Sequence, residues 1–423
     1  MIGLVARTRT NFAEKVKQIL HSLRWLLCAT MADFSYDDDN DDESQRVVAV
    51  ERSLEERCQG AVGARTAEAE KRCDAVTFQS LPPECKLKVF SYLTMQEKGL
   101  MERVCSEWRD LMRTRFLWNS VDLTRFQLHC QCPGRACSNA VCYDAYKERT
   151  EHFLKYLADV QPILKQLRFA FDIIDCQDDW LRVLRSFIGA VNLQKLELAQ
   201  LNWKETPVKP YPSESATWSS NNYHDLMYRH RRRQRHFVPF FDYFTASATN
   251  LSTLILPFDW SPASIRFLSR LQRLKSLVLE SYFVPQPLQQ ETLDDLLRGL
   301  PTLERLTVTV SIGSGLGMLT YRVASKSLKY LDLSCCQGFC LGDVHLPALT
   351  EFRTSCKPYA CPFVDATNTL ICAPCIYEVL CAGAPSLVSL NDHRLHPDWR
   401  ENSYDELETE LRRSCTCPKH KVV

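Results

Sequence analysis

The most informative part of this sequence reads SLPPECKLKVFSYL at residues 80–93 and VCSEWRDLMRTRFLW at residues 104–118. Ser80 is suited to capping a helix, because its hydroxyl can accept a hydrogen bond from an orphan backbone N–H of the first turn. Pro82 and Pro83 fit that turn, where a missing N–H costs nothing, and Glu84 complements the positive end of the helix dipole. About forty residues are too few to bury a core alone. We therefore expect a small helical module that docks on a partner surface.

Apolar side chains recur along this stretch with the spacing of amphipathic helices. Cys85, Val89 and Leu93 lie four residues apart, with Phe90 beside them. A second stripe at a spacing of three to four comprises Leu100, Met101, Val104, Trp108, Leu111 and Met112. An ordinary helical subdomain packed on the rest of the chain would show the same pattern, so the pattern alone leaves both interpretations open.

The order of these residues resembles the F-box, and the resemblance covers residues 78–122. Its matching positions are Leu81-Pro82-x-Glu84, Val89-Phe90-x-Tyr92-Leu93, Val104-Cys105-x-x-Trp108-Arg109-x-Leu111 and Leu117-Trp118. The family implies a three-helix motif that docks on a Skp-family adaptor, which links it to a cullin-based ubiquitin ligase. The adaptor-binding residues that the resemblance implies are Leu81, Pro82, Val89, Phe90, Leu93, Val104, Cys105, Trp108, Leu111 and Trp118.

The middle of this segment departs from the family's usual pattern. Lys98, Gly99, Glu102 and Arg103 are more polar, or weaker in helix propensity, than the residues commonly found there. Cys85 also stands where an aliphatic residue is commoner. Such residues can weaken an apolar contact with the adaptor.

Length and composition bound the class of protein. The chain has 423 residues, with 52 Lys and Arg against 51 Asp and Glu, and 20 cysteines. This length suggests two or three domains. The balanced charge gives no argument for nucleic acid, and no run of about 18 apolar residues predicts a membrane span. Because the N-terminus lacks a secretory signal, we expect the cysteines to be thiols in a reducing compartment, in the cytoplasm or the nucleus.

Residues 1–75 are expected to be mostly disordered, with an amphipathic helix at 11–28. That helix is either a membrane-surface or presequence-like segment, or an extension that is dispensable or binds a partner, and we favour the extension. The acidic run that follows at 33–43 is typical of a solvated segment. Met31 stands directly before this run, and the sequence leaves open whether it is an alternative start.

Beyond the F-box-like segment, a Leu-x-x-Leu-x-Leu pattern repeats. Strict matches occur at Leu193/Leu196/Leu198, Leu251/Leu254/Leu256, Leu274/Leu277/Leu279 and Leu328/Leu331/Leu333, and variants at Leu164/Leu167/Phe169, Leu303/Leu306/Val308 and Leu349/Phe352/Thr354. Roughly one strict match would arise by chance at this leucine content. Such periods resemble leucine-rich repeats, in which a strand with inward leucines precedes a helix on the convex side. Stacked units would leave a curved surface for protein recognition. The 58 residues from Leu193 to Leu251 are twice the 29 from Leu164 to Leu193.

The predicted organisation has five parts. The disordered region 1–75 precedes an F-box at 76–122 and a Cys-rich linker at 123–150. Degenerate repeats then occupy 151–395, with a polar insertion at 202–236, and a C-terminal helix and tail occupy 396–423. The insertion ends in a basic run at 229–236, which is either a nuclear localisation signal or site for acidic partners, or a solvated loop. No base-reading motif accompanies it, so we expect no nucleic-acid partner.

Cysteine clusters are the remaining candidates for chemistry. Cys356, Cys361, Cys372 and Cys375 have the best ligand count for a structural zinc, although only the last pair has the usual C-x2-C spacing. Two weaker groups comprise His129, Cys130, Cys132, Cys137 and Cys142, and Cys415, Cys417 and His420. The alternative is that these cysteines are buried or surface thiols. No cysteine stands in a recognisable motif with a histidine partner, so we predict no catalytic residue and no cofactor beyond that zinc.

These patterns predict an α/β protein with a short three-helix F-box, a curved leucine-rich-repeat solenoid and a disordered N-terminal region. The resemblance implies a non-catalytic, substrate-recognition subunit of a Skp–cullin–F-box ubiquitin ligase. The F-box would dock the Skp adaptor, and the repeats would hold a protein substrate for ubiquitination and proteasomal degradation. One alternative is a repeat-based scaffold or inhibitor that acts without ligase assembly. A second is a structural zinc-binding protein.

Overall fold

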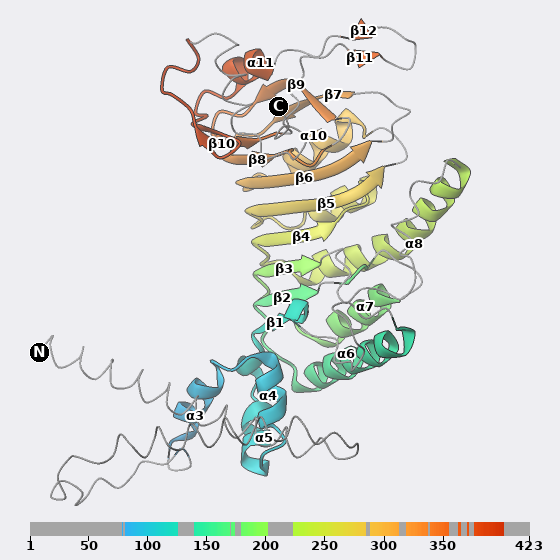
Figure 1. Ribbon diagram of the computed structural model, residues 1–423, viewed down its shortest axis with the longest axis vertical. Helices are drawn as coiled ribbons and strands as arrows, with labels where there is room; N and C mark the ends of the chain where they lie inside the picture. Colours follow the sequence, from blue (N-terminus) through green and yellow to red (C-terminus); the bar gives the residue numbers. More distant parts are fainter. Residues whose placement is uncertain are drawn as a thin grey trace, which may run out of the picture. The chain divides into compact units, whose positions relative to one another are not determined.

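The computed structural model describes residues 78, 81–125, 139–169, 171–173, 179–201, 223–284, 288–312, 319–336, 339–354, 363–364, 370–371 and 376–401. The chain divides into two compact units between Leu117 and Trp118 (Figure 1). We call the described residues before this division the helical unit and those after it the solenoid. The helix predicted at 11–28 and the tail from 402 lie outside the described residues.

The helical unit consists of three short α-helices and a 3-10 turn. They are α3 (Pro83–Phe90), α4 (Met95–Met101), α5 (Ser106–Met112) and η2 (Arg115–Trp118), which ends across the division. Thr94 and Glu97 form a capping box at the start of α4. Pro82 occupies the N-cap of α3 without a side-chain hydrogen bond, so the prediction that Ser80 caps this helix is wrong. The two prolines already fix the first turn, and the helix starts at the second of them.

An aromatic triangle forms the core of the helical unit. The rings of Phe78, Phe90 and Trp108 lie with their centroids 5.2 to 5.4 Å apart, in tilted and edge-on arrangements that aromatic pairs favour. Phe90 is almost fully buried, as are Val89 and Met112 of the same unit. The predicted apolar stripes of α3 and α5 therefore face each other in this unit.

The solenoid is built on a parallel sheet. Along it lie β1 (Ser120–Asp122), β2 (Gln166–Phe169), β3 (Leu198–Leu201), β4 (Thr253–Pro257), β5 (Ser276–Val284), β6 (Arg305–Ile312), β8 (Tyr330–Asp332), β10 (Glu351–Arg353) and β13 (Ser389–Leu390). Neighbours are parallel, and β14 (His393–Arg394) adds an antiparallel strand after β13. A 3-10 turn, η3 (Leu123–Arg125), follows β1.

Helices cover one face of this sheet. In Figure 1, α6 (Ala140–Val160), α7 (Trp180–Ala190), α8 (Tyr223–Ser247) and α10 (Gln290–Gly299) lie along one side of the stacked strands. A further helix, α9 (Pro262–Leu268), packs against α8 and α10. This alternation of parallel strands and helices confirms the predicted class, a leucine-rich-repeat type of α/β solenoid.

Later repeats use strands where earlier ones use helices. The strands β7 (Leu319–Ala324) and β9 (Phe339–His345) form a separate parallel pair, and α11 (Ile376–Gly383) packs against β9. A small antiparallel pair joins β11 (Phe363–Val364) and β12 (Leu370–Ile371). Among the described residues, no helix is both long enough and apolar enough to cross a lipid bilayer.

The strand register shows which residues are equivalent between repeats. The inward position of each strand is aligned with that of the next, from Val121 through Leu167, Ala199, Leu254, Leu277, Leu306, Leu331 and Phe352 to Leu390. All of these side chains are buried. The predicted units that start at Leu164, Leu251, Leu274, Leu303, Leu328 and Leu349 fit this register.

The predicted unit at Leu193 is wrong by three residues. Ala199 aligns with Leu254, so the unit runs Leu196/Ala199/Leu201, and Leu198 is half-buried on the opposite side of the strand. Leu193 lies in the turn before the strand, where its carbonyl accepts from the N–H of Leu196 at 3.0 Å. The buried residues of that turn happen to complete a strict leucine pattern, which is the kind of chance match expected once in this sequence.

Helix α8 corrects the predicted polar insertion. Residues 223–236 of that insertion are helical and continue into Phe237, Phe240, Phe241 and Phe244, which are buried. Because β3 pairs directly with β4, the long interval between them is one expanded repeat and not two repeats. Residues 140–150 of the predicted linker are likewise the start of α6, and the sheet begins at Ser120, ahead of residue 151.

Candidate protein-binding surfaces

The structure divides the ten residues that the F-box resemblance implies into an inner and an outer set. Val89, Phe90, Leu93, Trp108 and Trp118 are buried, and Leu81 and Leu111 are half-buried. Pro82, Val104 and Cys105 are exposed. Val89, Phe90, Leu93 and Trp108 belong to the core of the helical unit, Trp118 is buried in the solenoid, and the exposed residues remain available to a partner. Adaptor contact stays a prediction for all ten.

Two further apolar side chains of the helical unit face solvent. Tyr92 is 57% exposed and Phe116 is 51% exposed, compared with 47% for Val104. Tyr92 follows the end of α3, Val104 precedes α5, and Phe116 lies in η2. Single exposed apolar side chains are common on protein surfaces, so these residues are candidates for contact with a partner and do not by themselves establish a docking surface. The sequence did not predict Tyr92 and Phe116 as residues of a binding surface, because neither falls on a helical apolar stripe.

The polar middle of this segment has a structural role. Lys98 is buried in α4, and its Nζ donates a hydrogen bond to the backbone carbonyl of Leu117 at 2.7 Å. Burial lowers the pKa of the Lys98 ammonium. Glu102 forms an ion pair with Arg113 at 3.5 Å, whereas Gly99 faces open space. The departures from the family pattern therefore include one residue, Lys98, that ties α4 to η2.

A second buried lysine ties α3 to α5. The Nζ of Lys86 donates to Oε1 of Glu107 at 2.5 Å, and the Lys86 side chain is buried while that of Glu107 is half exposed. At the start of α5, Cys105 occupies the N-cap and its Sγ accepts from the N–H of Trp108 at 3.5 Å. Cys105 thus combines an exposed position with a local capping contact.

Trp118 belongs to the first repeat of the solenoid. In the β1–β2 register, Val121 aligns with Leu167, so Trp118/Val121/Leu123 corresponds to Leu164/Leu167/Phe169. Trp118 is 1% exposed, and its ring packs edge-on against Phe153 and Tyr156 of α6, with centroids 5.7 Å away. Sequence reasoning missed this role because tryptophan and valine replace the leucines of the motif.

The open face of the sheet, opposite the helices, presents two aligned rows of side chains. One row follows the register of Asp122, Arg168, Gln200, Ile255, Val278, Thr307, Asp332 and Arg353. The other follows Ser120, Gln166, Leu198, Thr253, Ser276, Arg305, Tyr330 and Glu351. The middle of the face is uncharged: Leu198, Ile255 and Val278 alternate there with Gln200, Thr253 and Ser276, and charged side chains lie toward both ends.

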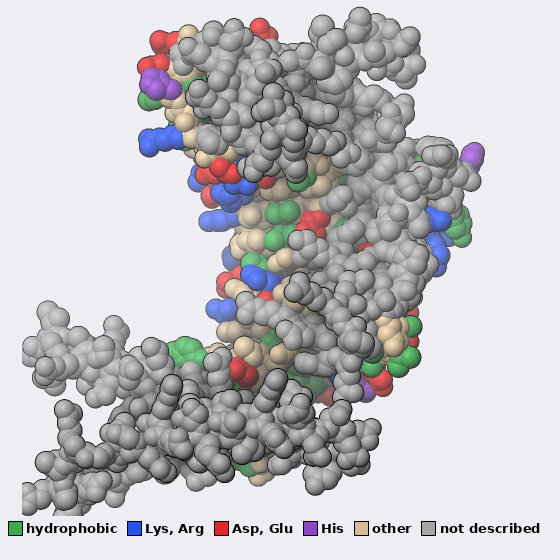
Figure 2. Space-filling model, in the orientation of Figure 1, with side chains coloured by type: hydrophobic (Ala, Val, Ile, Leu, Met, Phe, Trp, Pro, Cys, Tyr) green, Lys and Arg blue, Asp and Glu red, His purple; other side chains and the backbone are tan. Residues whose placement is uncertain are grey.

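Acidic and basic side chains alternate where the strands begin. Lys165 lies 3.9 Å from Glu197, and Glu304 lies 4.0 Å from Lys275 and 3.1 Å from Lys329. Figure 2 shows this mixture of charges along the edge of the stacked strands. The hydrogen bond from Lys329 lowers the pKa of Glu304. Exposed pairs of this kind contribute little stability, so we interpret them as a polar rim of the open face.

Arg305, Tyr330 and Arg353 come together toward the end of the open face, and we call them the Arg–Tyr–Arg cluster. The guanidinium carbon of Arg305 lies 3.9 Å from the centroid of the Tyr330 ring, and that of Arg353 lies 5.6 Å from it. The hydroxyl of Tyr330 donates to Asp332 at 3.1 Å. Burial, followed by the nearby Asp332 charge, raises the pKa of Tyr330. These three residues lie close together only because their strands are aligned, so no local sequence motif predicted the cluster.

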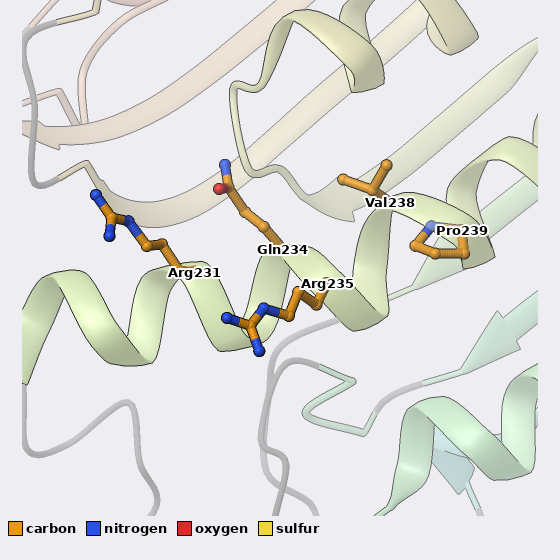
Figure 3. A pocket seen from close by; sticks show the side chains of 5 residues that line it. All are labelled: Arg231, Gln234, Arg235, Val238 and Pro239. Carbon is orange, nitrogen blue, oxygen red and sulfur yellow. The ribbon is translucent and has the colours of Figure 1, made fainter.

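The predicted basic run lies on α8 and borders a shallow hollow. Arg231, Gln234, Arg235, Val238 and Pro239 line it, with a volume of about 400 Å³ (Figure 3). Figure 3 shows Gln234 and Val238 on one side of the helix and Arg235 on another. Arg233 is buried, whereas Arg231 and Arg235 are exposed. The run is therefore partly structural and not a uniformly solvated loop.

The predicted zinc ligands Cys356, Cys361, Cys372 and Cys375 lie outside the described residues. So do His129, Cys130, Cys132, Cys137 and the cysteines of the C-terminal tail, while Cys142 lies half-buried in α6. Within the part of the chain that the structure describes, no group of three or more potential ligands could hold a metal ion. A structural zinc stays a prediction.

The fold defines a class of protein: a unit of three short helices followed by a leucine-rich-repeat type of solenoid. Residues 78–124 match the F-box-like family. Over 52 residues the chain is 40% identical to F-box/LRR-repeat protein 12 of Bos taurus and 38% identical to F-box/LRR-repeat protein 12 of Homo sapiens. Each match covers 12% of this chain and spans only 16% of the length of the curated relative. The match to the F-box-like family and the similarity to F-box/LRR-repeat proteins support the resemblance seen in the sequence, for an F-box-like domain followed by a leucine-rich-repeat type of solenoid.

Proposed function

We propose that the chain is the substrate-recognition subunit of a Skp–cullin–F-box ubiquitin ligase. The F-box-like domain docks a Skp-family adaptor, and the solenoid holds a protein substrate for ubiquitination and proteasomal degradation. The chain itself is non-catalytic and contributes proximity, because it holds a substrate lysine near a charged ubiquitin carrier. Such a subunit works in the cytoplasm or the nucleus, without a nucleic-acid partner.

One observation carries this proposal. The F-box-like match at 78–124 falls on helices whose inner residues are packed against each other and whose Pro82, Val104 and Cys105 remain exposed. A domain that has satisfied its own core and still presents apolar side chains is suited to a partner. The open face of the solenoid supplies a second and separate surface for a substrate.

Capture of the adaptor tests the first half of the proposal. The full chain is purified from cells and assayed for a co-purifying Skp-type adaptor and cullin. We expect Val104→Asp to reduce capture by about tenfold or more, because it places a charge in an apolar contact. The matched control is Val141→Asp, which changes a valine that is 73% exposed on α6, outside the matched domain.

Three outcomes decide between the interpretations. Capture by the wild type, lost in Val104→Asp and in Leu81→Ala with Pro82→Ala, supports ligase assembly. Failure of the wild type to capture the adaptor contradicts it and favours a scaffold that acts without the ligase. If the adaptor is captured, proteins that accumulate when the chain is depleted and that the purified complex ubiquitinates are its substrates; their absence would contradict the degradation role.

A further inference from the structure

We propose that the Arg–Tyr–Arg cluster is a specificity site that binds a single aspartate or glutamate side chain in an extended segment of the substrate. This inference rests on the proposed function and adds the chemistry of the substrate. The three residues come from neighbouring strands, since Arg305 of β6 is aligned with Tyr330 of β8, and Arg353 lies on the next strand, β10.

The tyrosine ring holds both guanidinium groups in place. Both lie within about 6 Å of the ring centroid, the range in which a cation is attracted to an aromatic face. Tyr330 is itself buried, and its hydroxyl is fixed by Asp332. Asp332 also accepts from the N–H of Ser334 at 2.9 Å and from its hydroxyl at 2.6 Å. Two long side chains are therefore ordered before a ligand arrives, which reduces the entropy lost on binding.

The cluster retains unused hydrogen-bond donors. Among the described residues, Arg305 forms no ion pair, although it is exposed at the surface. Arg353 is paired with Asp392, but its Nε is buried without an acceptor among those residues. A guanidinium group presents a planar fork that matches a carboxylate in two parallel hydrogen bonds. A carboxylate is thus the ligand group that would satisfy Arg305.

The surrounding charges favour one carboxylate over a phosphate or an acidic run. Glu351 is aligned with Tyr330, Asp332 is aligned with Arg353, and Glu304 directly precedes Arg305. Glu304 is paired with Lys275 and Lys329, and Asp392 with Arg353, whereas Glu351 and Asp332 form no ion pair among the described residues. These two acids disfavour a dianionic phosphate or several consecutive acidic residues more than a single carboxylate, a form of selection against the wrong ligand. Val278 and Thr307 continue the same face at half-buried positions. They can pack against the uncharged neighbours of a single acidic residue.

A peptide selection tests this site on the full chain. An unbiased library of short linear peptides is displayed and selected on the purified protein, and enriched peptides are then synthesised and measured by fluorescence anisotropy. We expect one position to be enriched in aspartate or glutamate, flanked by uncharged residues. Replacing that acid by its amide should weaken binding by about tenfold, the worth of a charged hydrogen bond.

Matched variants assign the effect to the cluster. Arg305→Gln should weaken the acidic peptide by about tenfold and should not weaken the amide peptide further, because the lost contact is the same one. Arg305→Lys should recover only part of the affinity, since it restores the charge but not the planar fork. Arg298→Gln, which changes an exposed arginine of α10 that pairs with Asp295, should bind like the wild type. Thermal unfolding of each variant checks that the solenoid is intact.

Several results would overturn the inference. They are selection of no peptides, enrichment without an acidic position, tighter binding of a phosphoserine version than of the carboxylate peptide, or equal binding by Arg305→Gln. The same variant is also assayed for adaptor capture, which should be unchanged. If the wild type captures the adaptor but selects no peptide with an acidic position, the specificity site is wrong and the proposed ligase function stands. If the wild type captures no adaptor, the ligase function fails independently of the peptide result.

Discussion

A buried ammonium group joins two elements of the F-box-like domain. Lys98 lies inside the domain, and its Nζ donates to the carbonyl of Leu117. Desolvation of a charge is costly unless it is hydrogen-bonded, and the lowered pKa of Lys98 reflects that cost. The contact compensates for the cost by satisfying a carbonyl at the end of the domain.

We expect Lys98→Met to destabilise the F-box-like domain by about 1–3 kcal/mol, because it leaves the Leu117 carbonyl without its donor. Lys88→Met is the control, since Lys88 is an exposed lysine of α3 in the same domain. Chemical denaturation, combined with hydrogen exchange of residues 81–117, measures both variants. Equal stability of the two would show that the buried hydrogen bond contributes nothing.

Two glycines give opposite expectations for the same substitution. Gly99 lies inside α4 with nothing within 4 Å of an added Cβ, so Gly99→Ala should stabilise the domain by about 0.5–1 kcal/mol. Gly383 ends α11, where an added Cβ would clash with the carbonyl oxygen of Val344. Gly383→Ala should therefore lower the thermal unfolding temperature of the solenoid. A raised temperature for Gly383→Ala would contradict the packing described between α11 and β9.

At the scale of elements, α8 combines a basic polar half with an aromatic half. Phe237, Phe240, Phe241 and Phe244 are buried, and stacked pairs link Phe237 to Phe241 and Phe240 to Phe244. These four-residue steps place the rings on one face of the helix. The aromatic half anchors the helix in the solenoid and carries the preceding basic residues with it.

This helix contains a histidine that should make stability depend on pH. Burial, and then the charges of Arg233 and Arg231, lower the pKa of His230 from its usual 6.5 to about 4. Between these values the unfolded chain binds a proton that the folded chain does not, so stability is present above pH 6.5 and is lost as the pH falls toward 4. The loss is at most about 3 kcal/mol.

Denaturation curves of wild type and His230→Gln, recorded over this pH range, measure the difference. The variant should lack this part of the acid sensitivity, whereas His236→Gln, an exposed histidine of the same helix, should retain it. A wild type and a His230→Gln variant with parallel pH profiles would exclude the effect.

The elements of the repeats were predictable where inward positions were leucine. Six predicted units fit the register, because the leucines of their motifs occupy the alternate strand positions that face the buried side of the sheet. The leucine motif predicted the wrong register at Leu193, because that residue of the turn is also a buried leucine. The motif did not detect the first repeat, because Trp118 and Val121 fill positions that leucines occupy in other repeats. Short motifs record residue type, whereas burial depends on the neighbouring strands.

The same limit applies to the candidate surfaces. The exposed residues Pro82, Val104 and Cys105 were predictable from the local F-box pattern. The Arg–Tyr–Arg cluster was not, because its members belong to three repeats of unequal length and meet only through strand pairing. Lys98 departs from the family pattern in the sequence, and its structural role was not predictable, because its acceptor is a backbone carbonyl that no sequence motif specifies.

At the scale of the whole molecule, the F-box-like match and the solenoid share residues. The match runs to residue 124, whereas the first strand of the sheet is β1 at Ser120–Asp122 and Trp118 packs against α6. The chain thus enters its solenoid before the F-box-like match has ended. The two assignments make different predictions for Trp118: its F-box position implies contact with the adaptor, whereas its place in the first repeat implies a role in the core of the solenoid.

We expect Trp118→Ala to destabilise the solenoid by about 3–5 kcal/mol, the usual cost of truncating a buried tryptophan. Hydrogen exchange should show the loss of protection in α6, whose Tyr156 contacts the Trp118 ring, and in β2, which pairs with β1. Phe116→Ala, two residues earlier and exposed, should leave that protection unchanged. If Trp118→Ala abolished adaptor capture while α6 and β2 kept their full protection, the tryptophan would serve the adaptor contact that its F-box position implies, and its assignment to the first repeat would be wrong.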